Sequence, residues 1–143
     1  MADASDADVV VDVDLDRCLA VAKRLAVEAG LLQSASTRAS LSIVSKGGID
    51  LVTDVDKKCE EIVFRGLRAA FPDHCFIGEE SAADVVLDDR PTWCVDPVDG
   101  TTNFIHKFPF FCVSIGLCIG REPVLGVIFD PTHGEVGGGG WRV

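Results

Sequence analysis

The chain has 143 residues, 48% of them hydrophobic and 25% charged, with a formal net charge of −10 at pH 7. This length and composition predict one globular domain with a hydrophobic core and leave too little chain for a second. An acidic chain without a basic patch does not hold a nucleic-acid backbone, so no nucleic-acid partner is expected, and a phosphate ester would need a bridging cation.

The N-terminal segment carries much of the negative charge. Six aspartates precede the first basic residue of the chain: Asp3, Asp6, Asp8, Asp12, Asp14 and Asp16. We expect residues 1–14 to be a disordered acidic lead-in, which differs from a secretory signal and from a basic transit peptide. The longest apolar run, residues 108–119, is too short and too interrupted to span a bilayer, so no membrane partner is expected.

The six cysteines lie mostly inside apolar runs, with no CxxC pair and no histidine at zinc-ligand spacing. Free cysteine in such positions behaves as a small hydrophobic residue. The pattern favours reduced, structural cysteines and a cytoplasmic location over the alternative of three disulfides.

Two segments have helical periodicity. Apolar residues at positions 15, 19, 22, 25, 26 and 29 predict a helix from Leu15 to about residue 30 or 32, followed by a polar loop over residues 33–40. A second stripe predicts a helix over residues 55–70, which Pro72 closes. Residues 41–44 and 49–52 flank a glycine turn and are expected to form two short strands.

The second half of the chain is typical of strands. Residues 75–78 and 92–96 are short apolar runs, and the second delivers Asp96 at its C-terminal end. Residues 111–119 alternate large and small side chains, and with residues 123–129 they predict a hairpin that turns at 121–122. Residues 137–140 are four consecutive glycines, which are unfavourable as the last segment of a domain.

Residues 96–102, Asp-Pro-Val-Asp-Gly-Thr-Thr, combine two carboxylates with a turn. Pro97 fixes φ and forces the turn, so that Asp96 and Asp99 can converge on one point. Mg²⁺ is usually held by a few carboxylates and by phosphate oxygens, and the Val98 carbonyl lies between the two acids. The segment therefore predicts a Mg²⁺ site, for which surface acids around an Asx turn are the alternative.

The residues that follow suit a phosphate. Gly100 permits a tight backbone path, and Gly100, Thr101 and Thr102 offer N–H groups and hydroxyls at a helix start. Upstream, Glu79 and Glu80 form a second acidic pair at the end of an expected strand. Taken alone, such a pair more often belongs to a solvated acidic loop.

Residues 93–104, Trp-Cys-Val-Asp-Pro-Val-Asp-Gly-Thr-Thr-Asn-Phe, resemble the first signature of the inositol monophosphatase family, of the plant or algal kind. The resemblance covers residues 15–136 and includes segments 50–56, 71–74, 76–81, 108–110 and 113–116. The Thr-Thr-Asn-Phe ending favours this branch over relatives that act on adenosine bisphosphates or fructose bisphosphate. The resemblance implies an α+β, layered sugar-phosphatase fold with N-terminal helices packed on a largely antiparallel sheet.

The resemblance also implies metal ligands at matching positions. Glu79, Asp96 and Asp99, with the carbonyl of Val98, would bind Mg²⁺ at a first site. Asp96 and Asp99 would face a second metal as well.

The same resemblance implies catalytic roles. Thr101, paired with Asp56, would orient and deprotonate the attacking water, and Glu80 would support another water. Asp56 has a competing structural role, because Thr53 and Asp56 have the spacing of a capping box, with Thr53 as the N-cap. One residue can serve both roles.

The implied activity is Mg²⁺-dependent hydrolysis of a small-molecule phosphate monoester of a polyol, within inositol metabolism and phosphatidylinositol signalling. Inositol 1-phosphate is the first candidate substrate, with L-galactose 1-phosphate and histidinol phosphate as rivals. The family's second half carries a Trp-Asp-x-Ala-Ala-Gly type motif that completes the second metal site, and that motif does not occur here.

We therefore expect residues 15–143 to be the truncated N-terminal part of one such domain, a fold that is incomplete without the C-terminal half. Its first metal site would be largely assembled, its second incomplete and its turnover weak or absent. The hairpin would expose apolar surface, with poor solubility as the consequence. The alternative function is a non-catalytic homologue that binds metal or a full-length partner, and a homodimer is the other assembly considered.

Overall fold

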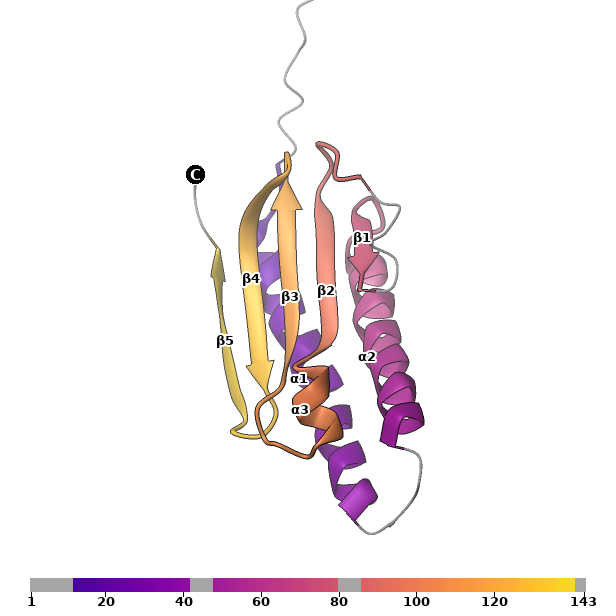
Figure 1. Cartoon of the computed structure of the whole chain (residues 1–143). Helices are drawn as coiled ribbons and strands as arrows, with labels where there is room; N and C mark the ends of the chain where they lie inside the picture. Colours follow the sequence, from indigo (N-terminus) through magenta and orange to yellow (C-terminus); the bar gives the residue numbers. More distant parts are fainter. Residues whose placement is uncertain (1–11, 42–47, 80–85, 141–143) are drawn as a thin grey trace, which may run out of the picture.

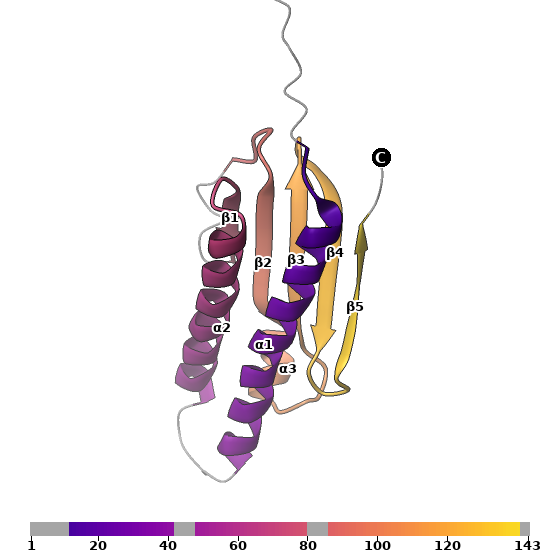
Figure 2. The same ribbon diagram turned by 180° about the vertical axis from the view of Figure 1, so that it is seen from behind.

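The computed structural model describes residues 12–41, 48–79 and 86–140. Within these ranges two long helices lie on one face of a five-stranded sheet of order β1-β2-β3-β4-β5 (Figures 1 and 2). The elements in chain order are α1 Leu15–Leu41, α2 Gly48–Ala70, β1 Cys75–Gly78, β2 Thr92–Asp99, α3 Thr101–Ile105, β3 Cys112–Ile119, β4 Glu122–Asp130 and β5 Glu135–Gly140. Strands β1 and β2 are parallel and the other neighbours are antiparallel. The predicted α+β class, with helices on a largely antiparallel sheet, is confirmed.

Helix α1 begins at an aspartate cap. The Oδ1 atom of Asp14 accepts a hydrogen bond of 3.0 Å from the backbone N–H of Arg17, which would otherwise have no intrahelical acceptor. The last residue of the expected lead-in therefore belongs to the helix start. Residues 1–11 of that lead-in lie outside the described residues.

The predicted end of α1 near residue 30 is wrong, because the helix continues through the expected loop to Leu41. Residues in this last part are tied to other elements: the Ser34 hydroxyl donates to the Pro131 carbonyl at 3.1 Å. The hydroxyl of Thr37 donates to the Gln33 carbonyl one turn earlier, at 3.0 Å. These bonds and the Ala, Gln and Arg residues of the segment favour helix over the local preference of serine and threonine for loops.

Helix α2 begins at Gly48, so its predicted start at residue 55 and the strand expected over residues 49–52 are both wrong. Val52 is buried and continues the apolar stripe of Val55, Cys59 and Val63 at helical spacing. Thr53 lies inside this helix and cannot be its N-cap, so the capping-box interpretation is wrong as well. The strand expected at 41–44 falls on the end of α1 and on residues outside the described ranges.

The core lies between the helices and one face of the sheet. Trp93 and Val95 of β2 are buried, and the alternating residues of β3, Val113, Ile115 and Leu117, are fully or almost fully buried. This alternation follows from the period of two in a strand, and it confirms the strands predicted around residues 92–96, 111–119 and 123–129.

The hairpin between β3 and β4 turns at Gly120 and Arg121, one residue earlier than predicted, and both have positive φ (58° and 69°). Strand β5 was missed, because a run of glycines has little β-propensity of its own. Its backbone nevertheless pairs with β4 along its whole length. A Cβ on Gly138 would lie 2.7 Å from the Gly126 carbonyl oxygen, so the close approach of these strands requires glycine there.

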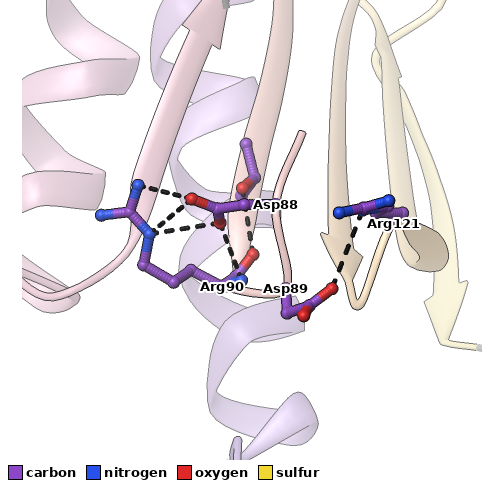
Figure 3. A network of polar contacts seen from close by, with 5 residues as sticks. Asp88, Asp89, Arg90 and Arg121 are labelled. Carbon is purple, nitrogen blue, oxygen red and sulfur yellow. Dashed lines mark hydrogen bonds and ion pairs between the residues drawn. The ribbon is translucent and has the colours of Figure 1, made fainter. Parts of the chain in front are cut away.

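Two exposed ion pairs lie where β2 begins (Figure 3). Arg90 pairs with Asp88 at 2.7 Å, and Arg121 in the β3–β4 turn lies 3.7 Å from Asp89. The second pair connects the segment before β2 to the hairpin turn, although exposed pairs of this kind stabilise little. Among the described residues, no helix combines the length and the apolar character that crossing a membrane requires.

Candidate metal and phosphate site

The parallel pairing of β1 and β2 brings two acidic residues to one edge of the sheet. Gly78 is in register with Val95, and both strands run in the same direction. Glu79, the first residue after β1, and Asp96, the next residue of β2, therefore follow this pair at the C-terminal end of β1. This register accounts for the proximity of two carboxylates to which the family resemblance gives the role of ligands of one metal.

A bulge in β2 positions the second aspartate. Asp96 is in register with Ser114 and Asp99 with Cys112, so the β2–β3 register shifts over Pro97 and Val98. Pro97 has no N–H to offer to a ladder, which explains why the irregularity falls here. Asp96 is half-buried, whereas Asp99 is exposed at the end of the strand.

The charges of Glu79 and Asp99 act on the carboxyl group of Asp96. Burial raises the pKa of Asp96, and the negative charges of Glu79 and Asp99 raise it further. The N–H of Val98, which donates to Asp96 Oδ1 at 3.2 Å, partly offsets this increase. Such repulsion between like charges favours either protonation or a bound cation.

The donor set fits a hard divalent cation. Carboxylate oxygens and a backbone carbonyl are the ligands that Mg²⁺ takes in proteins. Within residues 12–41, 48–79 and 86–140, no three His, Cys, Asp or Glu side chains have the spacing of a closed metal site. Glu79, Asp96 and Asp99 thus form an open set on one edge, and a cation would have to draw them together against their repulsion.

A thiol lies beside the exposed aspartate. Cys112 Sγ is 3.9 Å from Asp99 Oδ2. Burial, followed by the charges of Asp99 and Asp96, raises the pKa of this thiol to about 11. Because the thiolate is the nucleophilic form, this raised pKa disfavours Cys112 as a nucleophile at neutral pH.

Gly100 connects the strand to α3. Its φ of 88° is left-handed, and a Cβ there would lie 2.9 Å from the carbonyl oxygen of Phe110, so glycine is required. Helix α3 begins at the next residue, as predicted, and its first N–H groups have no intrahelical acceptor. Thr101 is half-buried and Thr102 is exposed.

The hydroxyl of Thr101 donates to the carbonyl oxygen of Val98 at 3.0 Å. This bond joins two residues of the predicted site, the threonine for which a catalytic role is predicted and the carbonyl for which a ligand role is predicted. The carbonyl oxygen has a second lone pair, so the bond does not prevent it from accepting a further interaction.

The remaining predicted residues are less closely placed. Asp56 is half-buried on α2, which contacts α3, and Figure 1 shows the N-terminal part of α2 at the same end of the sheet as α3. Glu80 lies outside the described residues. Beside Asp99 there is a cavity of about 510 Å³, lined by Asp99, Gly100, Asn103, Phe110, Phe111, Cys112, Ile128 and Asp130.

One polar residue that contacts this segment was missed by the sequence analysis. The Nε2 atom of Gln33 on α1 donates to the carbonyl oxygen of Pro97 at 2.6 Å, and Gln33 is fully buried. The available signal was its position, four residues after Ala29, on the buried stripe of α1. Because residues 33–40 were predicted as a loop, Gln33 was not counted as part of this stripe.

The sequence and structure comparisons with known proteins agree on one family. The model of the inositol monophosphatase family matches residues 14–139. Inositol monophosphatase 1 of Solanum lycopersicum is 50% identical over 125 residues, which are 85% of this chain and 46% of the relative. The chain thus spans about half the length of the curated relatives that it matches.

Solved structures agree with the sequence comparisons. The inositol monophosphatase from Anabaena (Nostoc) sp. PCC 7120 superposes with a TM-score of 0.75 at 37% identity, covering 90% of this chain and 45% of the other. The structure of inositol monophosphate bound SaIMPase-II superposes with a TM-score of 0.69 at 30% identity, covering 85% and 43%.

Proposed function

Because the chain belongs to the inositol monophosphatase family, we propose that it forms the Mg²⁺-binding part of a hydrolase for phosphate monoesters of small polyols. The observation that carries the proposal is the acidic set Glu79, Asp96 and Asp99 at the C-terminal edge of β1 and β2. Inositol 1-phosphate is the first candidate substrate, supported by the inositol monophosphate bound to SaIMPase-II.

Four groups would hold the ion: the carboxylates of Glu79, Asp96 and Asp99 and the carbonyl oxygen of Val98. Bound there, Mg²⁺ would neutralise charge on the transferring phosphoryl group and lower the pKa of a water molecule. Glu79 follows β1 and the other three donors lie in β2 across its bulge, so a bound cation would draw them together at one edge of the sheet.

The other residues act on water and on phosphate. In the proposal, Thr101 and Asp56 orient the attacking water and accept its proton, and Glu80 orients a second water. The N–H groups of Gly100, Thr101 and Thr102 at the start of α3 bind the phosphate oxygens. No protein nucleophile is required, in keeping with the raised pKa of the Cys112 thiol.

The test is release of inorganic phosphate from inositol 1-phosphate by the 143-residue chain with Mg²⁺. The rival substrates L-galactose 1-phosphate and histidinol phosphate are assayed beside it. We expect a low rate that requires Mg²⁺ and that disappears in Asp96→Asn, since this variant keeps the size of the side chain and loses its charge.

Equal rates in the parent chain and in Asp96→Asn would contradict the hydrolase proposal. Saturable Mg²⁺ binding without phosphate release from any of the three substrates would instead support a homologue that binds metal and does not turn substrate over.

A further inference from the structure

Gln33 is a polar residue at a position where the helix is otherwise apolar. The buried stripe of α1 consists of Cys18, Ala22, Leu25, Ala26 and Ala29, and Gln33 follows it with 0% of its surface exposed. A buried amide destabilises the fold unless its polar atoms are hydrogen-bonded. Its retention in the core therefore calls for a specific partner.

That partner is the carbonyl of Pro97, which accepts a hydrogen bond of 2.6 Å from Gln33 Nε2. The orientation of the amide is determined by chemistry, because a carbonyl oxygen can only accept and the Oε1 atom has no proton to donate. Within the part of the chain that the structure describes, Oε1 itself has no hydrogen-bond partner. The contact to Pro97 is thus the polar contact that orients this side chain.

The Pro97 carbonyl belongs to the same peptide group as the N–H of Val98, and that N–H donates to Asp96 Oδ1 at 3.2 Å. The peptide lies where the β2–β3 register is broken, so the regular ladder does not fix its orientation. Gln33 holds one end of the peptide, and the other end holds the aspartate. A donor at the carbonyl also polarises the peptide and strengthens its N–H as a donor.

We propose that Gln33 is a positioning residue of the metal site, which orients the Asp96 carboxylate through the Pro97–Val98 peptide group. The inference rests on the proposed function, because Asp96 matters here as a ligand of Mg²⁺. Residues that orient metal ligands from behind change metal affinity by about 10- to 100-fold when they are removed.

The experiment compares Mg²⁺ affinity, by isothermal titration calorimetry, in the 143-residue chain and in Gln33→Met. Methionine is as long and unbranched but cannot donate to Pro97. We expect Mg²⁺ binding at least about 10-fold weaker in the variant. In the metal-free chain, hydrogen exchange at the Val98 amide, followed by NMR, should become several-fold faster.

A purely structural role predicts a lower Tm with unchanged Mg²⁺ affinity, whereas the positioning role predicts weaker binding with little change in Tm. Gln33→Met removes one buried acceptor, Oε1, and leaves another, the Pro97 carbonyl, so Tm should change by no more than roughly 4 °C. Ser34→Ala is the matched control. It removes the neighbouring bond from α1, which reaches the Pro131 carbonyl rather than the metal loop, and should leave Mg²⁺ affinity unchanged.

A folded Gln33→Met that binds Mg²⁺ as tightly as the parent would overturn the inference. If that variant does not fold, Gln33→Asn decides: its amide is one methylene too short, and unchanged affinity, or failure of this variant to fold as well, also overturns it. If the parent chain binds no Mg²⁺, the proposed function fails. The Val98 exchange rates then decide the positioning role on their own.

Discussion

Thr101 shows how a single side chain can serve both the fold and the proposed chemistry. Its hydroxyl donates to the Val98 carbonyl at 3.0 Å, across the turn that contains Gly100. In the absence of substrate this bond fixes the carbonyl that the proposal assigns to Mg²⁺. The same hydroxyl is the one proposed to orient the attacking water.

Thr101→Val should therefore lower the free energy of unfolding by about 1 kcal/mol, since one hydrogen bond is lost without a change of shape. Thr101→Ser keeps the hydroxyl and should recover most of that loss. Urea denaturation of the three proteins measures the difference. Equal stability of the valine variant and the parent would show that the bond does not hold the turn.

His74 makes the fold sensitive to pH. The Trp93 indole N–H donates to His74 Nδ1 at 3.0 Å, and since indole can only donate, this nitrogen must be unprotonated. Burial lowers the pKa of His74, while the charge of Asp73 opposes the change. A histidine whose folded pKa is lowered stabilises the fold above its unfolded pKa of about 6.5, and this contribution is lost as pH falls through the folded value.

We expect His74 to make the free energy of unfolding fall by about 1 kcal/mol between pH 7 and pH 5, which is the worth of the hydrogen bond to Trp93. His74→Gln cannot titrate and should show a smaller decrease in denaturant titrations at the two pH values.

His133→Gln is the matched control for this pH dependence. The bond to Asp130 raises the pKa of His133, so its contribution is present below about pH 6.5 and is lost as pH rises. Removing it should make the decrease toward pH 5 larger. A decrease in His74→Gln equal to that of the parent would contradict the assignment.

Residues of the candidate site are easiest to predict where they are neighbours in sequence. Asp96, Val98 and Asp99 lie within four consecutive residues, and two carboxylates with a backbone carbonyl between them predict a metal site directly. Gln33 could not be predicted in the same way, because it reaches Pro97 from 64 residues earlier in the chain. Its contact with Pro97 depends on the packing of α1 against β2, and the local sequence pattern does not predict that packing.

At the scale of elements, the packing of α1 on β4 depends on a close approach. Gly30 of α1 is buried beneath the ring of Phe129, and a Cβ there would overlap ring carbons Cδ1 and Cε1. Gly66 of α2 has a similar relation to Leu25 of α1. Small residues at these two crossings set the distance between the layers.

Gly30→Ala should lower the free energy of unfolding by about 1–3 kcal/mol, because overpacking outweighs the gain in helix propensity. Gly139→Ala on β5 is the control, since a Cβ there has no atom within 4 Å among the described residues, and should change stability by less than about 0.5 kcal/mol. Thermal unfolding of both variants compares them. A Gly30→Ala chain as stable as the parent would mean that the layers are not packed this closely.

The strands were easier to predict than the ends of the helices. The alternation in β3 and the apolar run of β2 follow from burial of one sheet face against the helices, and both patterns are visible in the sequence itself. Helix α1 continues past residue 32 because tertiary bonds from Gln33 and Ser34 stabilise a segment that resembles a loop. Helix α2 starts earlier than predicted because Val52, which lies in the segment predicted as a strand, extends its buried stripe.

At the scale of the whole molecule, both long helices cover the same face of the sheet (Figure 2). Apolar side chains remain exposed elsewhere, among them Phe110 and Ile128 at 69% and 54%, and both line the cavity beside Asp99. The chain also spans about half the length of its curated relatives. The proposed metal ligands nevertheless all lie on the part present here, at the end of β1 and β2.

The central claim is that these ligands bind Mg²⁺, and calorimetric titration of the 143-residue chain with MgCl₂ tests it most directly. We predict saturable binding that is weakened more than about 10-fold by Asp96→Asn. Asp73→Asn, a change at an exposed residue before the opposite end of β1, should leave the affinity unchanged. Absence of saturable binding by the parent chain, or equal affinity in Asp96→Asn, would contradict the account.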